Sequence, residues 1–364
     1  MRQSGFFILN GFSLVESILL KCVGCCRLRA KQCSKTMSDL PFDRVSKSAT
    51  YENVGCDFFG PFQIKVRRSI VKRYGCVFTC LYSRAVHIEV CTDLSSDSFI
   101  LALRRFISIR GAVSCIRCDQ GTNFVGANNE LKASLNSMEQ GPIKSFLLSQ
   151  NCQIDFIFNP PSASHFGGVF ERQIGSIRKV LSSLLLEQGS ALTEESLITF
   201  LYEVSAILNC RPLSHLNLSD LTIEPLTPNH LLTQKSSVVV SPPGTFVKQD
   251  LYLHKRWRRV QYLANIFWKR WRQEYLDSIN KRQKWTGEQR NISVGDVVLL
   301  CDENEERNDW KLARVVECFT SNDGLVRSVK IQLASNELDP HGKRMSEPTF
   351  RTRPIHKLIL LIEA

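Results

Sequence analysis

Three acidic residues in distinctive settings could do chemistry in this chain. Asp57 lies within the apolar run Val54–Phe62, and Asp119 ends a second such run. Glu171 lies just inside a later segment with helical periodicity. Three carboxylates that converge can hold a pair of Mg²⁺ ions, and paired metal ions activate water or a hydroxyl group against a phosphodiester. The acidic residues therefore predict metal-dependent phosphoryl transfer, provided that the fold brings them together.

The spacing of apolar side chains predicts the elements that must position these residues. Continuous or alternating apolar residues predict strands over residues 54–64, 74–82, 85–92, 112–118 and 153–158. A helix capped at Ser95 or Ser96 should bury Phe99, Leu103, Phe106 and Ile107. The helix that carries Glu171 should bury the stripe Phe170, Ile174, Ile177, Leu181 and Leu184. This order predicts an α/β layer with a mixed sheet, in which active sites gather at strand ends.

The last third of the chain has a different pattern. Ser236–Thr245 has the composition of a linker, and Lys248–Lys284 is predicted to be one long helix with interleaved aromatic and basic residues. Aromatic side chains at this density more often form a packing face than a platform for stacking on bases. Short strands between Ile292 and Leu361, with a hairpin turn at Asn322–Gly324, predict a small β-barrel.

The charge of the chain favours a polyanionic partner. The 364 residues are enough for two or three domains, and the formal net charge is +12. Lys248–Arg290 contains 12 Lys or Arg and 4 Asp or Glu residues, so this segment holds 8 of the 12 excess charges. A solvated basic helix would explain the segment, but nucleic acid is the more specific interpretation and the one we favour.

The cysteines indicate a reducing compartment. Most of the 14 cysteines lie in apolar runs, where they behave as small hydrophobic residues, and their spacing does not resemble a secreted disulfide framework. Cys22 and Cys25 have the spacing of half a tetrahedral zinc site, and reduced, unliganded thiols are the alternative. We expect neither a secretion signal, since polar residues interrupt Phe6–Leu20, nor a membrane-spanning segment.

The motifs around the acidic residues point to a family. Asp57–Phe62, Asp119–Phe124 and His165–Glu171, in this order, resemble the integrase portion of a BEL/Pao-type retrotransposon polyprotein. Further matches lie at Trp310, at Asp323–Arg327 and at Arg353–Ile355, and the resemblance covers nearly the whole chain. The upstream histidines of the family's zinc module have no counterpart here, so zinc binding is in doubt.

The resemblance implies a ribonuclease H-like core whose Asp57, Asp119 and Glu171 are the catalytic residues and hold two Mg²⁺ or Mn²⁺ ions. It also implies four parts: a truncated zinc-binding-like segment (1–40), an integrase catalytic core (45–235), a basic helical segment (246–290) and a small C-terminal β-barrel (291–364). The expected activity is trimming of the element's DNA 3′ ends and their joining to target DNA. Such an enzyme should form a homo-oligomer on DNA and act in the nucleus, after a stage in a cytoplasmic particle.

DNA contacts are expected outside the triad as well. The candidates are Thr122, Asn123, His165, Arg178, Lys179, Lys255, Arg256, Arg258, Arg259, Lys269, Arg270 and Arg272. For Arg178 and Lys179, contact with a phosphate and simple solvation are equally good interpretations. His165 could instead stabilise its loop, and His87 is expected to be a packed residue of a strand. The alternatives to an integrase are an inactive or domesticated DNA-binding relic and a hydrolytic nuclease on the same fold.

Overall fold

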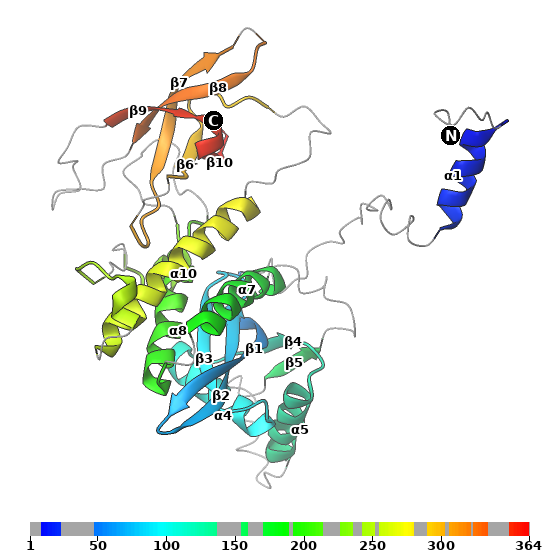
Figure 1. Cartoon of the computed structure of the whole chain (residues 1–364). Coiled ribbons are helices and arrows are strands. Elements are labelled where there is room, and N and C mark those ends of the chain that lie inside the picture. The colour runs from blue at the N-terminus through cyan, green and yellow to red at the C-terminus, as the bar shows by residue number, and fades with distance from the viewer. Residues whose placement is uncertain are drawn as a thin grey trace. The chain divides into compact units, whose positions relative to one another are not determined.

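The structure is a computed structural model of the chain (Figure 1). It describes residues 9–22, 47–136, 154–158, 170–188, 192–213, 226–235, 242–251, 255–279, 290–302, 306–321, 323–333 and 349–363. The chain divides into two compact units, Met1–Phe42 and Asp43–Ala364. No helix within the described ranges is long and apolar enough to cross a membrane.

The first unit contains helix α1 (Gly11–Lys21), which buries none of its own residues. Cys22 follows the helix and is exposed. Cys25 lies outside the described residues, so the half zinc site at Cys22 and Cys25 stays a prediction.

A mixed five-stranded sheet forms the centre of the second unit, as predicted. It consists of β1 (Asn53–Val66), β2 (Ser69–Cys80), β3 (Val86–Cys91), β4 (Cys115–Cys118) and β5 (Asp155–Phe158). The strand order is β3-β2-β1-β4-β5, in which β1 to β3 are antiparallel while β4 runs parallel to both β1 and β5. The pairing therefore changes from antiparallel to parallel between β1 and β4, the strand that leads to Asp119.

Helices cover both faces of this sheet. The helices are α4 (Ser96–Arg110), α5 (Thr122–Asn136), α7 (Phe170–Gln188) and α8 (Glu194–Asn209). Phe78 of β2 packs with α4 and α5, whereas its neighbour Val77 packs with α7 and α8. Successive residues of a strand point to opposite faces, so these two clusters are the two sides of the sheet. Most of the two predicted apolar helix stripes is confirmed: Phe99, Leu103 and Phe106 are buried in α4, and Ile174, Ile177, Leu181 and Leu184 in α7. Ile107 is only half-buried, and the side chain of Phe170 lies outside the described residues.

The basic segment does not form one continuous helix from Lys248. A short helix α9 (Pro228–Thr233) and a single 3₁₀ turn, η4 (Lys248–Leu251), precede α10 (Arg256–Ile279). The turn is held by Asp250, whose Oδ2 accepts a hydrogen bond from the Val247 N–H at 2.9 Å and whose Oδ1 pairs with Arg258 at 2.7 Å. This local carboxylate cap explains why the turn at Asp250 is not part of α10.

The aromatic residues of α10 pack rather than face solvent, as the sequence indicated. Phe267, Trp268 and Trp271 are at most 4% exposed and lie in one core with residues of α7 and α8. Trp257, near the start of the helix, is the exception, with 51% of its surface exposed.

A second five-stranded sheet forms the C-terminal region. Its strands are β6 (Val297–Leu300), β7 (Leu312–Thr320), β8 (Val326–Leu333), β9 (Thr349–Pro354) and β10 (Leu358–Ile362), the last two joined by the turn η5 (Ile355–Lys357). They pair antiparallel in the order β10-β6-β7-β8-β9. Among the described residues no pairing joins β9 to β10, so the closed barrel stays a prediction.

A buried polar network lies on β3, opposite helix α4. His87 is 2% exposed, as expected for a packed histidine, and Glu89 is 3% exposed. The Arg110 Nε donates to His87 Nδ1 at 3.4 Å, so the other ring nitrogen carries the proton and donates to Glu89 Oε1 at 2.8 Å. The Arg105 Nε donates to Glu89 Oε2 at 2.7 Å. Burial alone would raise the pKa of Glu89, but the hydrogen bonds from His87 and Arg105 outweigh it, and the pKa is lowered.

This network predicts a pH-dependent contribution to stability. A carboxyl group whose pKa is lower in the folded state stabilises the fold above its unfolded pKa, and that contribution disappears as the pH falls through the folded pKa. We expect Glu89→Gln to reduce the free energy of unfolding at pH 7 by about 1.5–3 kcal/mol, the usual value of hydrogen bonds to a charged group. The deficit should shrink below the ordinary glutamate pKa of 4.5.

Urea denaturation from about pH 3 to about pH 7, a range that spans the ordinary pKa of glutamate, measures this difference. Glu130→Gln, at an exposed position of α5, is the matched control and should follow the wild-type profile. A Glu89→Gln deficit that stays constant over this range would contradict the assignment.

Candidate active site

Asp57 lies within β1, and its carboxylate pairs with the side chain of Arg178 on helix α7. Asp57 Oδ1 accepts a hydrogen bond from the Phe58 N–H at 2.7 Å. Asp57 Oδ2 is 2.7 Å from Nη2 of Arg178, which also donates to the Phe58 carbonyl at 2.7 Å. The carboxylate is partly exposed, at 27%, so it remains open to solvent on one side.

Asp119 lies beside Asp57 because of the strand register. Gly55 of β1 pairs with Arg117 of β4 in the parallel sense, and each aspartate is two residues further along its strand direction. Asp119 is exposed, and its Oδ1 accepts a hydrogen bond from the Gly121 N–H at 3.0 Å. A Cβ at Gly121 would lie 3.1 Å from Asp119 Oδ1 and 2.5 Å from Asn123 Oδ1, so a larger residue there would displace the Asn123 side chain and crowd the Asp119 carboxylate.

Phe58 and Phe124, one from each aspartate motif, pack together and link the segments that carry Asp57 and Asp119. Phe58, next to Asp57, lies 5.4 Å in ring-centroid distance from Phe124, which follows Asp119 in the sequence. Both rings also contact Phe99 of α4. No role was predicted for these two phenylalanines, although the presence of a Phe in both motifs was a usable signal. They fix the start of α5, and with it Asp119, against β1.

The negative charges of the two aspartates repel each other. Burial raises the pKa of Asp57, the Arg178 guanidinium lowers it, and the negative charge of Asp119 raises it again, with a net upward shift. An aspartate is sensitive to a second carboxylate only at short range. The two acidic side chains therefore form one electrostatic site, which a bound cation would stabilise.

Helix α7 brings the third predicted residue towards this site. Ile174 and Ile177 pack in the same core as Phe59 and Phe62 of β1, and Arg178 reaches Asp57. Glu171 lies in the first turn of α7, seven residues before Arg178, or about 10 Å along the helix axis. Its side chain is outside the described residues, which contain no group of three metal-ligand side chains. Glu171 therefore stays a prediction.

The structure changes the interpretation of Arg178. Contact with a phosphate and simple solvation were the two expectations, whereas the guanidinium pairs directly with the first aspartate. The signal in the sequence was the spacing of seven residues from Glu171, which places Arg178 on the same flank of α7.

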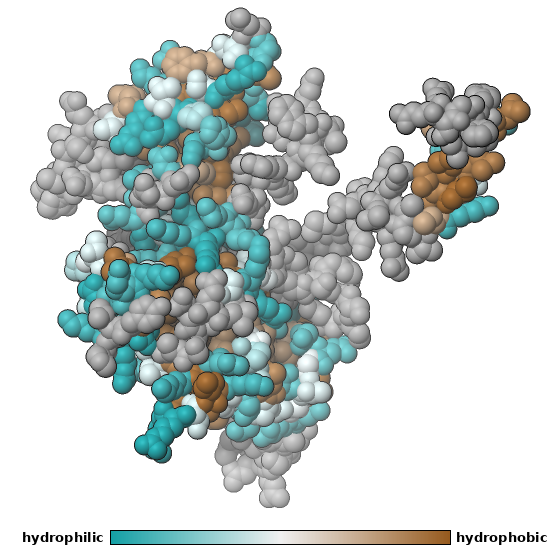
Figure 2. Space-filling model, viewed as in Figure 1, coloured by the Kyte–Doolittle hydropathy of each residue, from teal (hydrophilic) through white to brown (hydrophobic). Residues whose placement is uncertain are grey.

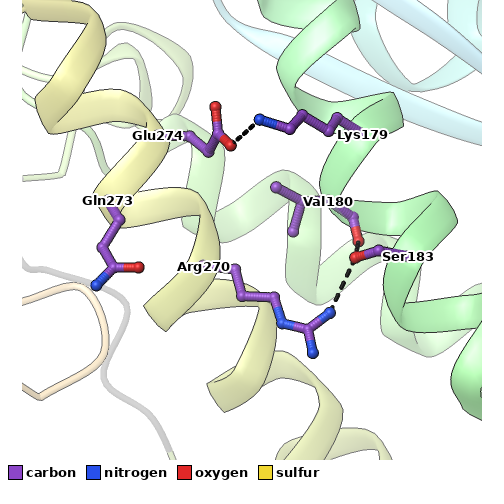
Figure 3. Close-up of a pocket in the computed structure, with 6 residues that line it drawn as sticks. All are labelled: Lys179, Val180, Ser183, Arg270, Gln273 and Glu274. Carbon is purple, nitrogen blue, oxygen red and sulfur yellow. Dashed lines mark hydrogen bonds and ion pairs between the residues drawn. The ribbon is translucent and has the colours of Figure 1, made fainter.

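Two further predicted DNA contacts, Lys179 on α7 and Arg270 on α10, lie where these two helices face each other. Lys179 pairs with Glu274, and Arg270 Nη1 donates to Ser183 Oγ at 2.9 Å. Figure 3 shows that these four side chains, with Val180 and Gln273, line a pocket between the two helices. Arg270 of α10 is thus held beside α7, the helix that carries both Lys179 and Glu171.

The other predicted DNA contacts differ in exposure. Lys255, Arg256 and Lys269 are exposed, while Arg258 pairs with Asp250 and Arg259 is half-buried. The structure contradicts a DNA contact at Arg272, which is 7% exposed and donates to the carbonyl groups of Leu300 and Asp302. Its guanidinium also lies over the Trp310 ring, so Arg272 joins α10 to the C-terminal sheet.

The remaining candidates are Thr122 and Asn123, at the start of α5, and His165, which precedes α7 in the sequence. Thr122 is exposed and Asn123 is half-buried, both beside Asp119. His165 lies outside the described residues. None of these contacts with DNA is tested by the geometry, and they stay predictions.

Comparisons with known proteins were made by sequence and by structure. A family model described as "Family of unknown function (DUF5641)" matches residues 255–361, which hold α10 and the C-terminal sheet. No curated protein matches the chain.

Several solved structures of viral integrases are similar to the chain. One is the simian T-cell lymphotropic virus intasome in complex with the PP2A regulatory subunit B56 gamma, with 12% identity, a TM-score of 0.35, and coverage of 96% of this chain and 91% of that one. The HTLV-2 integrase catalytic core domain in complex with magnesium (trimeric form) has 20% identity and a TM-score of 0.30, over 50% of this chain and 97% of that one. The catalytic core domain of BIV integrase has 14% identity and a TM-score of 0.32, over 50% and 95%. At these identities and TM-scores, the function of the chain has to be argued from its own residues.

Proposed function

We propose that the chain is a retrotransposon integrase of the BEL/Pao type, which trims the 3′ ends of the element's DNA and joins them to target DNA. The observation that carries the proposal is the convergence of Asp57 and Asp119 at neighbouring strands, with α7 held against them through Arg178. These two aspartates are 62 positions apart in the sequence, and each lies in a motif of the proposed family. The mixed sheet, with strand order β3-β2-β1-β4-β5, agrees with the mixed sheet expected of a ribonuclease H-like core.

The residues present fit a divalent metal site. Two solvent-accessible carboxylates whose charges repel each other favour a bound cation, and oxygen ligands suit Mg²⁺ or Mn²⁺. Asp57, Asp119 and Glu171 would hold the ions, with two ions as the proposed number. When bound, such ions activate the attacking oxygen and stabilise the leaving oxygen of a phosphodiester.

The chain's own residues would position the DNA. Phosphoryl transfer needs little covalent help from a protein, so catalysis depends on placement and charge. The glycine at position 121 keeps the Asp119 carboxylate and the Asn123 side chain uncrowded, because a Cβ there would lie against both. Arg178 already contacts one carboxylate and is 47% exposed, so it is placed to contact a phosphate next to the aspartates.

The domain boundaries, partners, cellular location and zinc site of the chain are part of the same proposal. The core would extend over residues 45–235, the basic segment over 246–290 and the C-terminal domain over 291–364, with DNA and further copies of the chain as partners. The chain would act in the nucleus, because the proposed reaction joins the element's DNA to target DNA. Zinc at Cys22 and Cys25 would belong to the N-terminal segment, residues 1–40.

A joining assay tests the proposal directly. A labelled duplex that mimics an element end is incubated with a plasmid, Mg²⁺ and either the wild-type chain or Asp119→Asn. We expect joining by the wild type and a loss of at least about 10³-fold in the variant, since a ligand of the reacting centre is removed. Binding without joining by the wild type would instead support an inactive relic, and cutting without joining would support a nuclease.

A further inference from the structure

The outer end of the β1–β2 hairpin carries a basic surface that the catalytic site does not use. β4 pairs with β1 only over Asn53–Gly55, and β3 pairs with β2 only over Tyr74–Thr79. Residues 62–73 therefore form a two-stranded ribbon beyond the rest of the sheet. Figure 2 shows a hydrophilic projection where Figure 1 places the tip of this hairpin.

The ribbon has one apolar face and one basic face. Phe62 and Ile64 are buried against the core formed with α7 and α8. The alternate residues, Gln63 and Lys65 on β1, are exposed, as are their partners Lys72 and Ile70 on β2. The turn between the strands adds Arg67 and Arg68, both exposed. We call the side chains of Lys65, Arg67, Arg68 and Lys72 the hairpin cluster.

The ribbon is anchored rather than loosely attached. The Lys65 N–H donates to the Leu192 carbonyl at 2.9 Å, just before α8. Arg73 Nε pairs with Glu194 at 2.7 Å, in the first turn of α8. These two contacts hold the ribbon, and with it the basic face, against the start of α8.

The charge of the hairpin cluster is not neutralised by neighbouring residues. No Asp or Glu occurs between Asp57 and Glu89 in the sequence. Among the residues that the structure describes, no ion pair involves a member of the cluster, whereas Arg73 beside it has its own carboxylate partner. Four exposed cations at one ribbon end make a strong local positive potential, which a polyanion would neutralise.

We propose that the hairpin cluster binds duplex DNA, a role that rests on the proposed function and adds a second contact surface to it. A two-stranded β-ribbon fits the major groove of B-DNA, and Lys, Arg and Gln are the side chains that contact phosphates and base edges there. Lys65 is eight residues from Asp57 along β1, which is at most about 27 Å at the rise of an extended strand. At about 3.4 Å per base pair, the hairpin would contact DNA up to about eight base pairs from the reacting phosphodiester.

The salt dependence of DNA binding tests this surface without reference to catalysis. The hairpin variant is Lys65→Gln, Arg67→Asn, Arg68→Gln and Lys72→Gln in the full chain. Asn is used at position 67 because Arg67 has a left-handed backbone, with φ of 54°. The control variant is Lys47→Gln, Arg84→Asn, Arg104→Gln and Lys235→Gln, all at exposed positions, and Arg84 has a matching φ of 57°. Both variants lose four positive charges from the net +12.

Affinity for a 30-base-pair duplex, a length of about three helical turns, is measured by fluorescence anisotropy without divalent metal at several salt concentrations. Each lost phosphate contact should lower the slope of log K against log salt by about 0.9, so we expect a slope smaller by about 2–4 in the hairpin variant. The control should keep the wild-type slope. A single-stranded oligonucleotide with the same number of phosphates should show a smaller difference between the two variants.

Equal slopes for the hairpin and control variants would overturn the proposal, and an equal loss on single strands would overturn binding in the groove. Lys65→Gln with Lys72→Gln, which leaves the turn intact, serves as a second variant if the first is unstable. Because binding is measured without metal, a failure here is distinct from a failure of the joining assay with Asp119→Asn.

Discussion

Asp57→Asn is expected to reduce the rate of DNA joining at least about 10³-fold, equivalent to about 4 kcal/mol of transition-state stabilisation. The amide cannot supply the negative charge that a divalent ion requires. The same substitution should change the free energy of unfolding by less than about 1 kcal/mol, because the ion pair that it removes joins two partly exposed groups. A large loss of activity with little loss of stability is the signature of a residue kept for chemistry.

The pH dependence of stability gives a second readout for Asp57. Burial and the charge of Asp119 raise the pKa of Asp57 in the fold, against the lowering effect of Arg178. A carboxyl group with a raised folded pKa costs stability when ionised, and this cost is removed as the pH falls through the folded pKa. Asp57→Asn should remove that part of the pH profile.

Joining rates and urea denaturation of the same preparations measure both effects. Asp155→Asn, at an exposed position of β5, is the matched control and should join DNA as the wild type does. Asp57→Asn that joins DNA within tenfold of the wild type would contradict a catalytic role for Asp57, on the scale of tenfold per 1.4 kcal/mol.

Trp271→Ala is expected to reduce the free energy of unfolding by about 3–5 kcal/mol, the usual cost of removing a large buried aromatic side chain. Trp271 is 4% exposed and packs with its ring 5.1 Å from that of Tyr275 and 6.1 Å from that of Trp310. Trp310 belongs to the C-terminal region, so this cluster joins α10 both to the core formed with α7 and α8 and to the second sheet. Loss of the ring would leave a cavity at that junction.

Trp257→Ala provides the control on the same helix. Trp257 is 51% exposed and contacts Phe246 and Arg258 at the surface. Its removal should cost about 1 kcal/mol, the value of such aromatic and cation–π contacts. Equilibrium urea denaturation of both variants measures the difference, and similar costs would show that the α10 aromatics do not form the packing face described above.

The sequence by itself determined the local elements and the positions of the acidic residues along them. The periods of two and of about 3.6 residues are properties of a single segment, so the strands around Asp57 and the buried stripes of α4 and α7 could be predicted without knowledge of their neighbours.

Only the tertiary structure decided which side chains meet and which are buried. The register of β4 against β1 places Asp119 beside Asp57, and this register depends on packing between segments about 60 residues apart. The pairing of Arg178 with Asp57, the burial of Arg272 and the capped turn at Asp250 likewise depend on partners that no local period reveals. The exposure of the hairpin cluster follows from where β3 and β4 stop pairing, which is decided by the whole sheet and not by the hairpin's own residues.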